Sequence, residues 1–239
     1  MLKNLLKILL FFFVGIFGGI FGSQILWPYF VERPLFFEYR LEQQPIYITQ
    51  NITKEIKIQE NLALQEAIEE VKRAILAIKS ETKKGKIFKG SGIIVFKEGL
   101  ILTLADLVPE FSKVNVFFDG KKFPAEVLKR DKKENLVLLK IEKEDLQPVK
   151  FGDFEKMRLG QRVFLIGVFF EKNIQKKVVN EGILKSFDRN LIETNIFEDP
   201  SLIGSSLFDI EGNLIGLNFV EKGKIFSIPI SKIKSFLGL

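Results

Sequence analysis

The feature that most constrains this chain is an uncharged, apolar run close to its N-terminus. The residues from Ile8 to Val31 carry no charge, and only Ser23 and Gln24 among them are clearly polar. A helix rises about 1.5 Å per residue, so about 20 residues cross a hydrocarbon core of about 30 Å. The run is therefore long enough to span a membrane, and we expect the chain to meet the membrane through Ile8–Trp27.

The charges that flank this run predict an orientation. Lys3 and Lys7 precede it, whereas the residues that follow it mix both signs. Positive residues stay on the cytoplasmic side, so we expect a single-pass protein with a cytoplasmic N-terminus and an extracytoplasmic C-terminal domain. A cleaved signal peptide is the alternative, but the run is longer than a signal core and no Ala-x-Ala site follows it.

The overall composition allows a sizeable core and argues against nucleic-acid binding. The chain has 239 residues, of which 46% are hydrophobic, which is enough for one domain or a tightly packed pair. The formal charge of +6 comes from 36 basic and 30 acidic residues that are spread along the chain. A nucleic-acid-binding face gathers its basic residues, so we expect no nucleic-acid partner.

Two residue types are missing from the chain altogether. It contains no histidine and no cysteine. We therefore expect no metal site, no cofactor and no disulfide. The side chain that most often serves as a general base near neutral pH is missing as well.

Hydrophobic periodicity divides the chain into an anchor, a linker and a β-rich domain. Residues 32–60 show no sustained helical period and are predicted to form an extended linker, whereas Asn61–Val71 and Ser231–Leu239 are predicted helices. Between these helices, short β runs recur at intervals typical of an all-β fold. We predict strands at Ala74–Ile78, Ile93–Phe96, Leu100–Thr103, Val114–Phe118, Phe123–Leu128, Leu136–Ile141, Val163–Val168, Val178–Leu184, Leu191–Thr194 and Ile225–Ile228.

One further pair of runs has the turn chemistry of a hairpin. Leu207–Ile210 and Leu214–Leu217 are joined by Glu211-Gly212-Asn213, in which glycine supplies a positive φ. This hairpin and several other blocks resemble trypsin-like serine proteases of the HtrA/Deg type. The other blocks that carry the resemblance are Gly90–Val95, Gly99–Thr103, Arg130–Ile141, Gly160–Gly167, Gly182–Ile183 and Phe226–Pro229.

The resemblance implies an all-β, chymotrypsin-like fold of two six-stranded antiparallel barrels with a cleft between them. It divides the chain into an anchor at 1–31, a linker at 32–60 and a barrel domain at 61–239, with the barrels at 61–145 and 146–239. The family's usual C-terminal PDZ domain is not expected, because the chain ends shortly after Pro229.

The same resemblance indicates that the catalytic positions are degenerate. Asp106 stands where the family has its catalytic histidine, Asn135 replaces the aspartate and Ile203 replaces the serine nucleophile. A Ser-His-Asp triad needs a hydroxyl, a base and a carboxylate, and loss of the aspartate alone costs about 10⁴ in rate. The oxyanion loop departs from the family pattern as well, at Ser201 and Ser205 around Gly204.

Two other chemistries use neighbouring residues. Ser205 or Ser206 could act as a nucleophile if a desolvated lysine served as base, although serines here are more simply turn residues. Asp106 with Asp199 or Glu198 could form a carboxylate pair for acid–base work or cation binding.

Our principal hypothesis from the sequence is an inactive HtrA-like protein, a pseudoprotease that binds extended peptides or envelope proteins. The alternatives are a structural or assembly protein with a filled cleft, and a residual serine endopeptidase. The oligomeric state stays open at this level. The orientation of Ile203, into an open cleft or into a packed core, distinguishes the first two hypotheses.

Overall fold

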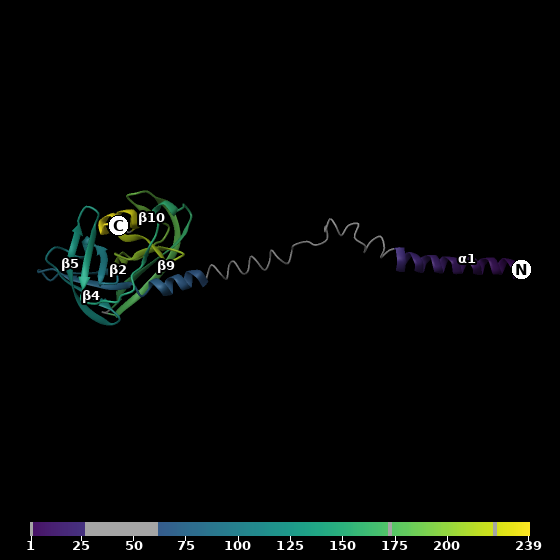
Figure 1. Ribbon diagram of the computed structural model, residues 1–239, viewed down its shortest axis with the longest axis horizontal. Helices are drawn as coiled ribbons and strands as arrows, with labels where there is room; N and C mark the ends of the chain where they lie inside the picture. Colours follow the sequence, from purple (N-terminus) through teal and green to yellow (C-terminus); the bar gives the residue numbers. More distant parts are fainter. Residues whose placement is uncertain (1, 27–61, 172–173, 222–223) are drawn as a thin grey trace. The chain divides into compact units, whose positions relative to one another are not determined.

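The computed structural model describes residues 2–26, 62–171, 174–221 and 224–239 (Figure 1). The chain divides into two units, Met1–Lys57 and Ile58–Leu239. In the first unit, α1 (Leu2–Phe21) continues into a π-helical turn, η1 (Gly22–Leu26). Leu6–Ile25 is long and apolar enough to cross a membrane. The predicted linker at 32–60 and the end of the expected span at Trp27 lie outside the described residues.

The second unit begins, within the described residues, with a helix at 62–71 and continues into a closed six-stranded barrel. The strand order around this barrel is β1-β2-β3-β6-β5-β4, and all neighbours are antiparallel. Its strands are β1 (Ile75–Glu81), β2 (Ile87–Phe96), β3 (Leu100–Leu104), β4 (Lys113–Phe118), β5 (Lys121–Asp131) and β6 (Leu136–Ile141).

The second barrel is closed by the predicted hairpin. Its sheet runs in the order β11-β8-β9-β10-β13-β12-β7, and an additional β11–β12 pairing joins six of these strands into a ring. The two-residue strand β7 is added parallel to β12. The strands are β7 (Lys150–Phe151), β8 (Arg162–Glu171), β9 (Ile174–Phe187), β10 (Ile192–Thr194), β11 (Ser206–Asp209), β12 (Asn213–Glu221) and β13 (Lys224–Pro229).

Most of the predicted elements are confirmed, and the differences lie mainly in strand length. β2 and β9 are several residues longer than predicted, because glycine and serine interrupt the apolar pattern at the start of β2 and exposed polar and lysine residues do so at the start of β9. The parallel strand β7 was missed, since two residues carry no periodicity. The hairpin turn is confirmed, because Gly212 has a φ of +79° and the Asp209 carboxylate accepts the Glu211 and Asn213 amides at 3.0 and 2.9 Å.

The two barrels share an apolar core. Alternating strand residues such as Ile78, Ile93 and Leu139 are fully buried in the first barrel, while Phe164 stacks on Phe208 at 5.3 Å in the second. One contiguous cluster of buried residues includes members of both barrels. Full burial of such a side chain contributes about 1.5–3 kcal/mol to the stability of the fold. Because the cluster continues from one barrel into the other, the barrels meet at a packed interface.

The terminal helix α3 (Ile230–Leu237) confirms the predicted C-terminal helix and connects the two barrels (Figure 1). Ile233 and Phe236 are its buried apolar contacts, as expected from the sequence. Lys129 of β5 donates to the Phe236 carbonyl at 2.5 Å, and Lys234 of α3 donates to the Gly152 carbonyl at 2.8 Å. The helix therefore holds both barrels in one arrangement.

Candidate functional site

Two of the three predicted triad positions form a hydrogen-bonded pair. Asp106 lies on η3 (Ala105–Leu107), directly after β3, and Asn135 lies in the turn before β6 with a φ of +55°. The Asn135 amide nitrogen donates to Asp106 Oδ2 at 2.8 Å, and Asn135 Oδ1 accepts the Asp106 backbone amide at 3.0 Å. The fold therefore brings these two positions together.

The chemistry of this pair differs from that of a catalytic base. Asp106 is exposed and Asn135 is half-buried, and an asparagine amide does not titrate. Neither side chain is the histidine that most often takes a proton from a hydroxyl near neutral pH. Arg130 stabilises the same loop, because its guanidinium donates to the Val108 carbonyl at 2.5 Å. The pair fixes a loop between β3 and β6.

The segment that carries the third position begins with a capped 3₁₀ turn, η5 (Pro200–Leu202). Asp199 is its N-cap, and its carboxylate accepts the Ser201 backbone amide at 2.8 Å. The Ser201 hydroxyl and this amide hold the pKa of Asp199 below its usual range. The amide at the expected oxyanion position thus donates back into its own turn.

Ile203 is half-buried and packs against the shared core cluster. Its carbonyl accepts the Ser91 backbone amide of β2 at 3.0 Å. The next residue, Gly204, has a φ of +80°, and a Cβ there would lie 2.7 Å from Leu107 Cδ1 and 2.4 Å from the Ser91 carbonyl oxygen. The loop is therefore packed tightly between β2 and the residue that follows Asp106.

Ser205 and Ser206 are both fully buried. The Ser205 hydroxyl accepts a hydrogen bond from Asn218 Nδ2 at 3.0 Å, and the Ser227 hydroxyl donates to Asn218 Oδ1. The interpretation of both serines as turn residues was wrong for Ser206, which opens β11. The chain turns at Gly204, whose φ is positive, and both serines that follow it are shielded from solvent.

The carboxylates proposed for acid–base or cation chemistry have separate partners. Asp106 pairs with Asn135, and Asp199 pairs with Ser201. Within the described ranges, no group of three or more acidic, histidine or cysteine side chains is arranged to hold a metal ion.

Two cavities of the second unit lie away from these positions. One, of about 440 Å³, is bounded by β7, η4 (Phe154–Lys156) and the β11–β12 turn. The other, of about 390 Å³, lies between the helix at 62–71 and residues 146–150. Neither is lined by Asp106, Asn135 or Ile203.

The family of the chain follows from comparison with known proteins. A family model described as "Trypsin-like peptidase domain" matches residues 90–217, which is more than half of the chain and includes strands of both barrels. The chain belongs to the trypsin-like peptidase family. Its similarity to DegP-like and HtrA proteins assigns it to the HtrA type, which confirms the resemblance recognised in the sequence.

Two relatives illustrate the extent of this similarity. The chain is 31% identical over 157 residues to a "Probable periplasmic serine endoprotease DegP-like" of Halomonas elongata, covering 59% of this chain and 32% of the relative. It is 32% identical over 164 residues to "Serine protease HTRA1" of Xenopus tropicalis, covering 62% of this chain and 35% of the relative. The chain thus covers about a third of the length of these relatives.

Sequence reasoning missed two features of this HtrA-type site. The Asp199-Pro200-Ser201 sequence is a helix-start signal, with an N-cap acceptor followed by proline at the first helical position, and it could have predicted η5. The buried network around Asn218 had no such signal, because its members lie on three different strands or loops.

Proposed function

We propose that this protein is a catalytically inactive, membrane-anchored HtrA-type protein that acts as a binding or scaffold module in the cell envelope. The observation that carries this proposal is the hydrogen-bonded pair of Asp106 and Asn135 at two of the expected triad positions. A carboxylate held by an amide offers no base that could activate a hydroxyl at neutral pH.

The loop after η5 supports the same proposal. Ile203 has no nucleophilic atom, and the Ser201 amide is engaged by Asp199. Preorganised donors that point at the developing oxyanion are worth about 10²–10³ in rate each, and an amide bonded within its own turn supplies none of this. Ser205 and Ser206 are fully buried, so their hydroxyls are not accessible to a substrate.

Between the two non-catalytic hypotheses, the packing of Ile203 favours a filled cleft. Its carbonyl bonds to β2, and Gly204 packs on Leu107, in the position where an open groove would need space. We therefore propose a scaffold role that uses the outer surface of the barrels.

The proposed location follows from the N-terminal helix and from the relatives. Leu6–Ile25 is able to span a membrane, and several relatives are named as periplasmic. With Lys3 and Lys7 before the span, the barrel unit would lie outside the cytoplasm. Membrane fractionation with external protease tests this topology, and a soluble product that starts after residue 22 would contradict it.

The inactivity is tested with the full-length chain in detergent micelles. We expect no hydrolysis of casein or of peptide esters above a no-protein control. A matched Ser205→Ala variant distinguishes true turnover from contamination. Hydrolysis that this substitution abolishes would contradict the proposal.

A further inference from the structure

The β1–β2 hairpin of the first barrel ends in a concentration of lysines. Residues 79–89 and the loop at 109–113 contain six lysines and two glutamates, without arginine or aspartate. Of the two glutamates, Glu110 pairs with Lys132 at 2.6 Å and Glu81 stands opposite Lys113 in the sheet. This end of the barrel is therefore basic.

The same end of the barrel exposes apolar side chains. Phe111 is 82% exposed, and within the described ranges no large apolar side chain is more exposed. Ile87, on β2, is 47% exposed. The ammonium of Lys83 lies 5.4 Å from the centre of the Phe111 ring, so the hairpin turn and the loop are neighbours. We call the exposed residues of this surface the basic tip: Lys83, Lys84, Lys86, Ile87, Lys89, Phe111 and Lys113.

The backbone at Phe111 fixes its ring in the exposed position. Phe111 has a φ of +57°, a conformation that bulky residues rarely adopt. The turn is closed on both sides of the backbone, because the Ser112 amide and hydroxyl both donate to the Pro109 carbonyl, at 3.2 and 2.7 Å. A strained backbone that presents a large ring to solvent indicates a contact with a partner.

The residue types of the basic tip favour a lipid surface as that partner. Single-stranded nucleic acids are bound in grooves whose aromatic side chains stack on bases, and nucleic-acid recognition favours the planar fork of arginine. Here every cation is a lysine, and Phe111 stands on a turn. Lysines around an apolar side chain match anionic headgroups, with the ring at the boundary of the acyl chains.

The chain itself would keep this surface near a membrane. Leu6–Ile25 is long and apolar enough to span one, and residues 27–61 join it to the barrel unit. At a limit of about 3.5 Å per residue, these residues reach no farther than about 120 Å. Such a tether raises the effective concentration of the basic tip at the lipid surface, so that a weak contact is sufficient.

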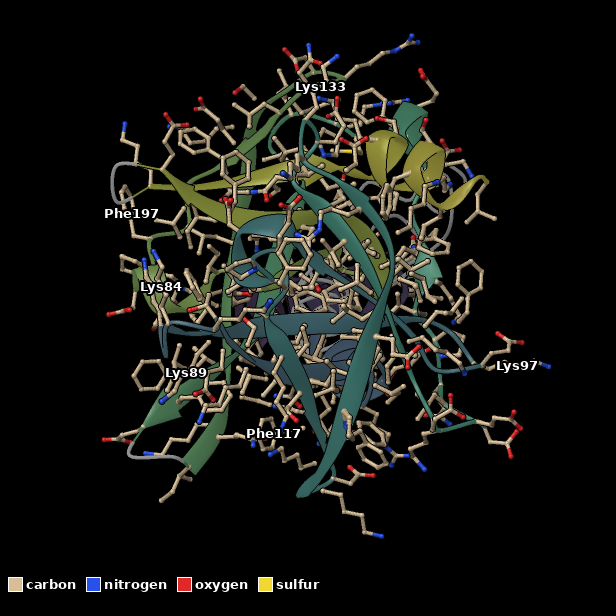
Figure 2. All side chains as sticks on the ribbon, turned by 90° about the vertical axis from the view of Figure 1, so that its left-hand side faces the viewer. Lys84, Lys89, Lys97, Phe117, Lys133 and Phe197 are labelled. Carbon is tan, nitrogen blue, oxygen red and sulfur yellow. The ribbon has the colours of Figure 1, made fainter. Side chains whose placement is uncertain are left out.

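We propose that the basic tip docks the barrel unit onto the anionic headgroups of the membrane that the N-terminal helix spans. This inference rests on the membrane anchorage in the proposed function and does not depend on the lack of hydrolysis. Phe111 and Ile87 enter the headgroup boundary, and the lysines lie against the lipid phosphates. Figure 2 shows Lys84 and Lys97 on opposite sides of the barrel unit, so docking through the basic tip holds Lys97 away from the lipid.

The absence of native cysteine allows a single reporter to be placed on the tip. Full-length Phe111→Cys, labelled with a nitrobenzoxadiazole fluorophore, is reconstituted into vesicles of phosphatidylcholine mixed with phosphatidylglycerol. A nitroxide on the lipid acyl chains quenches only a fluorophore that reaches the lipid, and both leaflets have the same composition, so the orientation of the chain has no effect. We expect strong quenching, and several-fold weaker quenching in pure phosphatidylcholine or at high salt.

The matched control for the reporter is Leu159→Cys, which is 68% exposed. Leu159 precedes the start of β8, whose far end carries the Phe170 ring that Lys89 contacts at 5.3 Å. At about 3.3 Å per residue, the two ends of this strand are about 25 Å apart. A fluorophore at position 159 should therefore remain unquenched in both kinds of vesicle.

Charge reversal provides the second arm of the test. In the Phe111→Cys background, the combination of Lys83→Glu, Lys84→Glu and Lys86→Glu should reduce quenching in the mixed vesicles several-fold. The combination of Lys97→Glu, Lys121→Glu and Lys122→Glu makes the same change in charge on exposed lysines at the other end of the barrel, and should leave quenching unchanged. Circular dichroism checks that each variant is folded.

The outcomes separate docking from anchorage. Flotation with pure phosphatidylcholine vesicles measures the anchor alone, and a chain that fails to float contradicts the anchor, while docking is still read from quenching in the mixed vesicles. An unquenched position 111 there, equal quenching at positions 111 and 159, or equal losses in the two triple variants would overturn the proposal. A fluorescence change with a single-stranded oligonucleotide or an acidic peptide, but not with the mixed vesicles, would overturn it as well.

Discussion

Restoring the three triad residues tests how deeply catalysis has been lost. The variant combines Asp106→His, Asn135→Asp and Ile203→Ser. The first two positions already share two hydrogen bonds, so a histidine–carboxylate pair fits their geometry. Full burial of an isoleucine side chain is worth about 1.5–3 kcal/mol, so removing the half-buried Ile203 should cost about 1–2 kcal/mol. For a domain of this size, that lowers Tm by about 2–8 °C.

Activity should remain low in this variant, because the Ser201 amide still donates to Asp199. A missing oxyanion donor costs about 10²–10³ in rate. The loop also departs from the family pattern at both Ser201 and Ser205. Thermal unfolding followed by circular dichroism, together with casein hydrolysis, measures both effects. A decrease of more than about 4 kcal/mol in the free energy of unfolding would show that Ile203 is fully packed in the core. Efficient cleavage of casein would refute the argument about the oxyanion loop.

Three further predictions concern the loop after η5 and its surroundings. Gly204→Ala should lower the free energy of unfolding in urea by at least about 3 kcal/mol, because its Cβ would meet backbone atoms. The control Gly85→Ala also has a positive φ but lies in open space, so it should cost about 1–2 kcal/mol. Equal losses would contradict the close packing at Gly204. The pKa of the Asp199 carboxyl should lie below its usual range in an NMR titration, and Ser201→Ala should raise it while keeping the backbone amide of the cap. Because the folded pKa is depressed, the contact stabilises the protein above the unfolded pKa and is lost as pH falls through the folded value. An unchanged pKa in Ser201→Ala would show that the Ser201 hydroxyl contributes nothing and that the backbone amide alone acts on the carboxylate. Asn218→Ala should cost about 2–3 kcal/mol in the same unfolding assay, because it leaves two buried hydroxyls without their partner, and a cost below about 0.5 kcal/mol would contradict the network.

The fold was largely predictable from the sequence because its turns carry their own chemistry. Gly212 has a positive φ in the turn where one was expected, and the alternation of apolar residues marked most strands. The pairing of Asp106 with Asn135 followed from the resemblance alone, since these residues are far apart in the chain and only the barrel topology joins them.

The rest of the site could not be predicted, because it depends on how a loop packs. The burial of Ser205 and Ser206 results from a left-handed turn at Gly204 that fits against β2, and no local pattern encodes the position of β2.

The central claim, that no serine of this chain is a nucleophile, is tested most directly by covalent labelling. The unmodified full-length chain in detergent micelles is incubated with a fluorophosphonate probe, and its intact mass is measured before and after peptide mapping. Ser205 and Ser206 are fully buried, so we predict an unchanged mass under conditions that label an active HtrA-type protease completely. A stoichiometric adduct on either serine would contradict the account.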